Sequence, residues 1–152
     1  PSIILRDHKL SGVYKHFVQN EHDELLRGFD PVFNAPQSRY GEISMADYTS
    51  ITGLNVLANS DEGGAYIVAS EDKRLVFVTG HPEYDSESLK QEYQRDLLTN
   101  AQPQIPVNYF VNNDPSKEPM VSWRAHGSLL FTNWLNYYVY QNTPYDLAQL
   151  SE

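Results

Sequence analysis

His81 and Glu83 lie two residues apart, directly after an apolar strand pattern that ends at Gly80. A histidine held by a carboxylate can act as a general base, because the carboxylate orients the ring and stabilises the imidazolium. Gly80 permits a sharp turn, and Pro82 restricts the backbone between the two polar side chains. The segment is therefore a candidate acid–base site. The spacing alone is equally compatible with a turn histidine bonded to backbone groups beside a solvated carboxylate.

The nucleophile that such a base would serve is not evident in the sequence. The chain contains no cysteine, and none of its serines lies in a Gly-x-Ser-x-Gly pattern. The absence of cysteine excludes disulfides and thiolate metal sites within these residues. The remaining histidines lack the spacing of metal ligands, so we expect no metal site. They are His8, His16, His22 and His126, and His126 is expected to fix the start of the last helix.

Composition indicates one structural unit of 152 residues that can bury an ordinary core. The net charge of −9, from 20 acidic and 11 basic residues, disfavours nucleic acid and anionic lipid as partners. Mean hydropathy is −0.54. No apolar run approaches the ~20 residues that span a bilayer, and the first ten residues lack the layout of a signal peptide. We therefore expect a cytoplasmic protein without membrane association.

Apolar periodicity and turn residues predict an order of elements. Segments 10–18, 54–59, 65–69 and 75–79 read as strands, and Gly63-Gly64 suits a hairpin between the second and the third. Segments 21–26 and 44–48 read as helical turns, and segment 34–41 reads as a loop. Asp85 or Ser86 can cap a helix with Leu89, Tyr93 and Leu97 on one face. A loop over 103–119 with four prolines, long enough to cover a site, precedes a helix over 127–140 that we expect to be packed on several sides.

Several separated motifs resemble the C-terminal half of the homoserine O-succinyltransferase family. Together they cover most of the chain from Lys9 to Leu147, and the last is long and idiosyncratic. The matching stretches are Lys9-Leu10-Ser11-Gly12-Val13-Tyr14, Arg27-Gly28-Phe29-Asp30, Ser38-Arg39-Tyr40, Leu57-Ala58-Asn59-Ser60, Thr79-Gly80-His81-Pro82-Glu83-Tyr84-Asp85, and Trp123-Arg124-Ala125-His126-Gly127 followed by Asn133-Trp134-Leu135-Asn136-Tyr137-Tyr138-Val139-Tyr140.

The resemblance implies an α/β fold, namely the C-terminal portion of a class I glutamine-amidotransferase-like (flavodoxin-like) three-layer fold. It also implies a Cys-His-Glu site in which His81 is the base and Glu83 orients it. The family's cysteine lies upstream of the stretch that corresponds to Pro1. We therefore expect residues 1–152 to form a single unit that is the C-terminal half of an acyltransferase domain, inactive alone because the half carrying the nucleophile is absent.

Three further positions match substrate-binding positions of the family: Lys9, Ser38 and Arg95. A planar guanidinium suits an amino-acid carboxylate, and a lysine is a point-charge alternative. Spacing alone favours a structural role for all three residues, in which Arg95 pairs with Glu92 or Gln91 on the helix surface. Lys9 then reads as an exposed lysine at the start of a strand, and Ser38 as a loop cap.

The implied reaction is transfer of a succinyl or acetyl group from succinyl-CoA or acetyl-CoA to the hydroxyl of L-homoserine, in methionine biosynthesis, with no permanently bound cofactor. L-serine is an alternative acceptor, because one methylene changes binding by only about 1–3 kcal/mol. The expected partners are the N-terminal half that carries the cysteine and a second copy of the chain in a homodimer. Two other hypotheses remain: a glutaminase-type amidotransferase, and a catalytically silent domain that binds an amino acid or another subunit.

Overall fold

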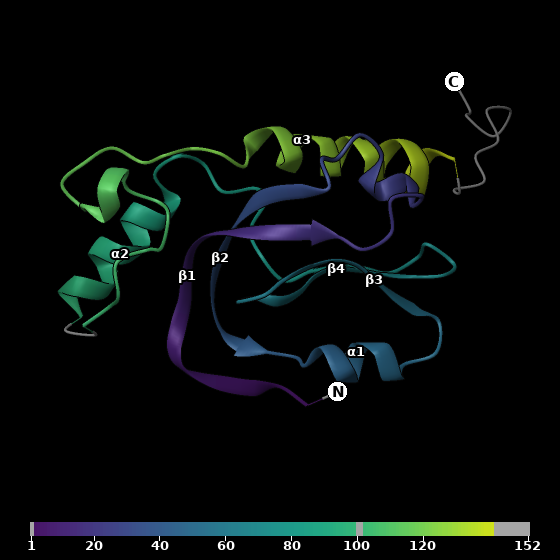
Figure 1. Ribbon diagram of the computed structural model, residues 1–152, viewed down its shortest axis with the longest axis horizontal. Helices are drawn as coiled ribbons and strands as arrows, with labels where there is room; N and C mark the ends of the chain where they lie inside the picture. Colours follow the sequence, from purple (N-terminus) through teal and green to yellow (C-terminus); the bar gives the residue numbers. More distant parts are fainter. Residues whose placement is uncertain (1, 100–101, 142–152) are drawn as a thin grey trace, which may run out of the picture.

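The computed structural model describes residues 2–99 and 102–141. Within these residues five strands form one sheet in the order β2-β1-β3-β4-β5, and each pair of neighbours is antiparallel. Figure 1 shows β1 and β2 side by side as long, strongly bent strands. The strands are β1 Ile4–Val18, β2 Val32–Glu42, β3 Leu54–Ser60, β4 Gly64–Ser70 and β5 Val76–Val78.

Helices lie around this sheet in three places (Figure 1). The helix α3 runs along one side of β1 and β2, α2 lies at one end of the molecule, and α1 follows β2 at the opposite side from α3. The helices are α1 Met45–Ser50, α2 Ser88–Leu98 and α3 Arg124–Asn133, which continues as the π-helix η3 Trp134–Tyr140; the 3-10 turns are η1 Glu24–Leu26 and η2 Val111–Asn113. None of the helices in the described part of the chain has the length and apolarity needed to cross a membrane.

Several predicted elements are confirmed. The predicted strands over 54–59 and 65–69 form the β3–β4 hairpin, and the strand before the His81 turn is β5. The helical turn predicted at 44–48 is α1, in which the Ser44 side chain accepts a hydrogen bond from the Asp47 amide. The predicted helix after the His81 turn is α2, but its N-cap is Glu87 and not Asp85 or Ser86. The Asp85 carboxylate accepts from the Glu87 amide at 2.8 Å in the turn that leads into the helix.

The predicted loop over 34–41 is wrong, because these residues belong to β2. The segment contains Pro36 and several polar residues, yet it pairs with β1 over Gly12↔Gln37 and its neighbours. Alternate side chains of β2 are buried against residues that are distant in the sequence. The strand β1 also begins at Ile4, earlier than the predicted residue 10.

The last helix differs from the prediction in its surroundings. It begins at Arg124, and its outer face is open, since Phe131, Trp134 and Leu135 are 45%, 41% and 40% exposed. The expected burial on several sides is therefore wrong for this face. Leu130 and Tyr138 of the same continuous helix are buried in the main core.

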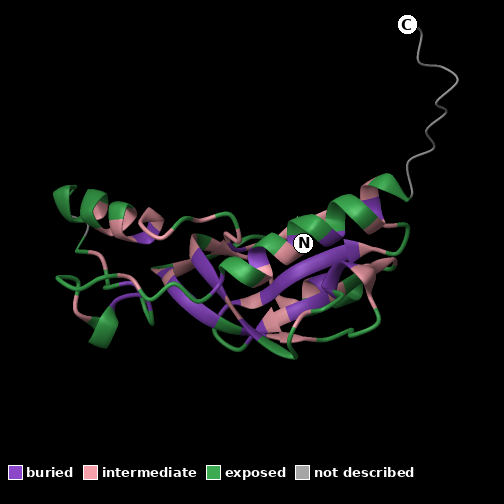
Figure 2. Cartoon of the chain, turned by 90° about the horizontal axis from the view of Figure 1, so that it is seen from above, coloured by how far each residue is buried: buried purple, intermediate pink, exposed green. Residues whose placement is uncertain are grey.

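The buried side chains form three clusters. Figure 2 shows that much of the buried chain, in purple, lies along the strands. The main cluster lies between β3, β4, β2 and the last helix. The second joins α2 to β1 and to the long loop 103–119, whose Val107 amide donates to the Ser11 carbonyl at 3.0 Å. That loop therefore attaches α2 to the sheet. Members of the second cluster are Val13, Leu89, Tyr109, Phe110 and Trp123.

Candidate active site

The turn after β5 brings His81 and Glu83 together. The Nδ1 atom of His81 lies 2.8 Å from Oε1 of Glu83, and the two side chains are 32% and 53% exposed. The backbone of the turn is anchored at its base, where the His81 amide donates to the Pro36 carbonyl of β2 at 2.9 Å. A bond between two side chains on one anchored turn holds the imidazole in a defined orientation.

Two glycines allow this turn to pack against neighbouring backbone. A Cβ added to Gly80 would lie 2.6 Å from the Pro36 carbonyl oxygen. A Cβ added to Gly127 on α3 would lie 2.5 Å from the Pro82 carbonyl oxygen. Both distances are shorter than a real Cβ contact, so only glycine lets β2 and α3 approach the turn from both sides. The turn is held between these two elements.

The hydrogen bond defines the chemistry available to His81. A carboxylate only accepts, so in the neutral ring Nδ1 carries the proton that is donated to Glu83, and Nε2 keeps its lone pair. A base must present such a lone pair to the proton it removes, and the carboxylate stabilises the imidazolium that results. The pair therefore has the composition and geometry of a base with its orienting carboxylate.

A cavity of about 540 Å³ opens beside the pair. Its wall is mostly apolar and comes from β5, the His81 turn and the open face of the last helix. Phe131 and Trp134 are partly exposed because their side chains line this cavity. The lining residues are Leu25, Arg74, Val76, Val78, Gly80, His81, Pro82, Glu83, Leu130, Phe131 and Trp134.

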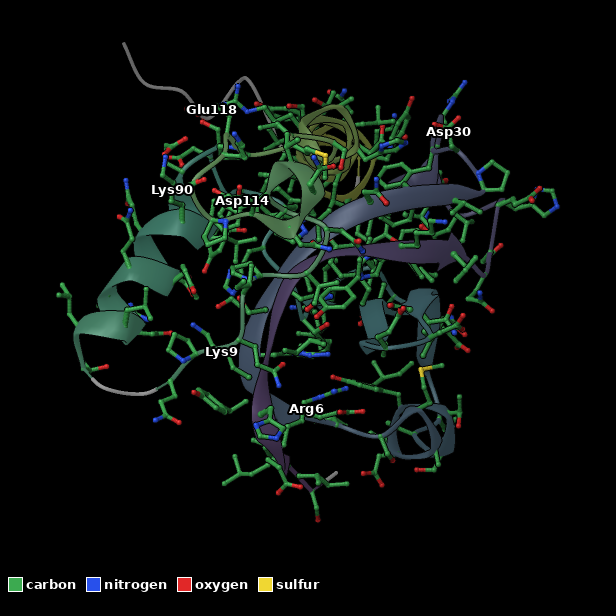
Figure 3. The ribbon with its side chains drawn as sticks, turned by 60° about the vertical axis from the view of Figure 1, so that its left-hand side comes forward. Arg6, Lys9, Asp30, Lys90, Asp114 and Glu118 are labelled. Carbon is green, nitrogen blue, oxygen red and sulfur yellow. The ribbon has the colours of Figure 1, made fainter. Side chains whose placement is uncertain are left out.

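A second polar cluster forms where β1, β2 and α2 meet. Lys9 Nζ lies 2.8 Å from Glu92 Oε2 and 3.0 Å from Asp96 Oδ2, and the lysine side chain is only 16% exposed. The Ser38 hydroxyl donates to the same oxygen of Glu92. Figure 3 shows Lys9 on β1, on the side that faces α2. Two predicted substrate-binding residues thus share one carboxylate.

Electrostatics keep this cluster charged. Burial opposes the charged form of Lys9, but the bonds to Glu92 and Asp96 outweigh it and raise the pKa of the lysine above its ordinary value. Burial also opposes the charge on Glu92, yet bonds from Lys9, Ser38 and Tyr84 hold the pKa of its carboxyl below the usual range. At neutral pH the lysine is a cation and Glu92 is an anion.

Arg95 lies at the rim of this cluster. Its Nη2 atom is 2.8 Å from Asp96 Oδ1, and its side chain is 65% exposed. The pairing predicted on the helix surface exists, but with Asp96 instead of Glu92 or Gln91. Lys9, Ser38 and Arg95 are therefore joined through the two acidic residues of α2. His81 and Glu83 form a separate pair.

Sequence reasoning missed Glu92 and Asp96 as members of the site. The only local signal was their spacing of four residues, which places both on one face of α2. Acidic pairs at this spacing are common on solvated helices, so the signal was not specific.

Two solved structures share the fold of this chain. The protein SMU.1228c matches with a TM-score of 0.59 and 16% identity over 87% of this chain and 53% of its own. A glutamine amidotransferase from Thermotoga maritima matches with a TM-score of 0.58 and 13% identity over 91% of this chain and 55% of its own. The fold is therefore that of a portion of a glutamine-amidotransferase-like α/β protein.

Sequence similarity narrows this class to one family. A family model for homoserine O-succinyltransferase matches residues 4–145, and the chain belongs to that family. The homoserine O-succinyltransferase of Pseudoalteromonas atlantica is 71% identical over 147 residues, and that of Alteromonas mediterranea is 67% identical over 148. Each match covers 97% of this chain but only 48% and 47% of the relatives. The chain spans about half the length of the curated relatives it matches.

Proposed function

We propose that this chain carries the base and the acceptor-binding residues of a homoserine O-acyltransferase, and that its cysteine nucleophile lies on a segment outside these residues. The observation that supports this most directly is the bond between His81 and Glu83 beside a cavity. It occurs in a chain of this family that contains no cysteine. The site has a base and its orienter within these residues, and needs a thiol from elsewhere.

The reaction divides into two steps that use the same base. In the first, His81 Nε2 takes the thiol proton, the thiolate attacks the thioester carbonyl, and coenzyme A leaves with the proton returned by the imidazolium. In the second, Nε2 takes the proton of the acceptor hydroxyl, whose oxygen attacks the acyl-cysteine. The cysteine thiolate leaves and recovers the proton. Glu83 stabilises the imidazolium in both steps.

The cluster on α2 suits a zwitterionic amino alcohol as acceptor. Such a molecule needs cations for its carboxylate and acceptors for its ammonium group. Lys9 and the exposed Arg95 are the cations, Glu92 and Asp96 are the carboxylates, and Ser38 adds a hydroxyl. We assign homoserine as the acceptor from the family, with L-serine as the alternative that the experiment must separate.

The donor that the family name supports is succinyl-CoA, with acetyl-CoA as the alternative. The product would enter methionine biosynthesis. In this proposal the acyl-CoA is a co-substrate, and the protein has no permanently bound cofactor.

The test uses the complete gene product that carries these residues. Release of free coenzyme A thiol is measured with succinyl-CoA or acetyl-CoA, each with L-homoserine, L-serine or no acceptor. The proposal expects rapid thiol release with succinyl-CoA and homoserine, and a loss of about 10²–10⁴-fold in His81→Ala. Glu83→Gln should also lose activity, because it removes the carboxylate that orients His81. Glu71→Gln, at an exposed position, is its matched control and should keep full activity. Thiol release from no combination would leave a silent binding domain.

A further inference from the structure

Tyr84 lies between the His81–Glu83 pair and the cluster on α2. Its ring stacks on the His81 imidazole with centroids 4.2 Å apart and planes inclined by 12°. Its hydroxyl donates to Oε1 of Glu92. Tyr84 is not among the site residues predicted from the sequence, and no other contact in the described part of the chain joins the two groups so directly.

The backbone of Tyr84 is fixed independently of its side chain. Its amide donates to the His81 carbonyl at 3.2 Å, and its own carbonyl accepts from Trp123 Nε1 at 2.9 Å. Trp123 is 1% exposed and belongs to the second core cluster. The ring of Tyr84 is therefore a rigid surface, set by the core, on which the partly exposed His81 rests.

Stacking supplies what the bond to Glu83 cannot. A single hydrogen bond at Nδ1 fixes the direction of one ring atom but leaves the plane of the imidazole free to rotate about that bond. The parallel ring of Tyr84 fixes the plane. Together they define where the Nε2 lone pair points. Aromatic pairs of this kind change populations by roughly two- to ten-fold.

The hydroxyl of Tyr84 orients Glu92 in the cluster on α2. Glu92 presents Oε1 to Tyr84 and Oε2 to both Lys9 and Ser38. Burial, followed by the bond to Glu92, raises the pKa of the Tyr84 phenol far above its ordinary value, so the hydroxyl remains a donor at neutral pH. Without that donor, one oxygen of a partly buried carboxylate loses its bond and the carboxylate is free to turn. Lys9 and Ser38 would shift with it.

We propose that Tyr84 is a positioning residue that sets the general base and the acceptor-binding cluster relative to each other. Its ring orients His81, and its hydroxyl orients Glu92. The inference rests on the proposed function for its kinetic consequences, but the stacking on His81 has a readout that does not depend on activity.

The test compares Tyr84→Phe and Tyr84→Leu in the complete gene product. Tyr84→Phe keeps the stack and loses the hydroxyl, so the KM for the acceptor should rise about ten-fold while kcat changes less than about two-fold. Tyr84→Leu loses the stack as well, so kcat should also fall roughly two- to ten-fold. Tyr93→Phe on α2, where the ring packs against Phe110, is the control and should leave both constants unchanged.

A second readout follows the chemical reactivity of His81. Carbethoxylation by diethyl pyrocarbonate, measured on the His81 peptide by mass spectrometry, should be faster in Tyr84→Leu and unchanged in Tyr84→Phe. The proposal would be overturned if Tyr84→Phe and Tyr84→Leu changed kcat and KM to the same extent and the change followed the loss of folded protein. It would also be overturned if both variants kept the wild-type kcat and KM. An inactive wild-type protein would refute the proposed function instead. The His81 reactivity would then still decide whether Tyr84 positions the imidazole.

Discussion

His16 is a buried histidine in the core behind the candidate active site, and we predict that it makes the protein acid-sensitive. The side chain is 0% exposed. Its Nδ1 donates to the Tyr14 carbonyl at 2.9 Å, and its Nε2 accepts from the Gln37 amide at 3.0 Å, which describes a neutral ring. The amide nitrogen of Gln37 in turn lies close behind Gly80, at the base of the His81 turn.

The size of the effect follows from the pKa of His16. Burial is the main cause that lowers this pKa from 6.5 to about 4, and the nearby Arg39 charge adds to it. Above pH 6.5 neither the folded nor the unfolded state is protonated, so the ring contributes nothing to the pH dependence. As the pH falls from 6.5 toward 4, only the unfolded state takes up the proton, and stability is lost. The loss between about pH 7 and about pH 5 is about 2 kcal/mol, and it approaches about 3 kcal/mol below the folded value.

The assay is urea unfolding of the complete gene product at several pH values between these limits, for the wild type and for His16→Gln. Other titrating groups affect both proteins equally, so the difference between the two pH slopes isolates His16. The wild type should lose about 2 kcal/mol more than the variant. His22→Gln, at an exposed position, should keep the wild-type slope. Equal slopes in wild type and His16→Gln would refute the assignment of a neutral, buried His16.

Three further substitutions test how the site is held. Gly80→Ala should cost about 1–3 kcal/mol of unfolding free energy, because the added Cβ meets a backbone carbonyl at 2.6 Å; an unchanged urea midpoint would contradict this. Glu83→Gln should fold normally but lower kcat by about 10²–10⁴-fold through loss of the stabilised imidazolium on His81, with wild-type turnover as the contrary result. Lys9→Met should destabilise by about 1–3 kcal/mol, since Glu92 loses its cation, and this loss should shrink once Glu92 is protonated at low pH.

The parts of the fold that depend on neighbours in the sequence were predictable. The β3–β4 hairpin, α1 and the turn at His81 each follow from a local signal such as Gly63-Gly64 or the Ser44 cap. The strand β2 could not be predicted from local signals, because its stability comes from pairing with β1. Gln37 shows the difficulty, since a polar residue that read as loop is fully buried against His16, 21 positions away in the sequence.

The same distinction holds for the site. The bond between His81 and Glu83 spans two residues on one turn, so a sequence pattern can suggest it. The bonds of Glu92 to Lys9 and Ser38 span 83 and 54 positions, and only the folded chain brings them together. Resemblance to the family pointed to Lys9 and Ser38 as binding residues, but it could not reveal the carboxylate that joins them.

The most direct test of the central claim is the intact mass of the complete gene product after exposure to succinyl-CoA without an acceptor. The account predicts a mass gain of one succinyl group, located by peptide mapping on a cysteine outside these 152 residues and discharged when L-homoserine is added. His81→Ala should not acquire the group at a comparable rate. A wild-type protein that gains no acyl group from succinyl-CoA or acetyl-CoA, or that carries it on a residue of this chain, would contradict the account.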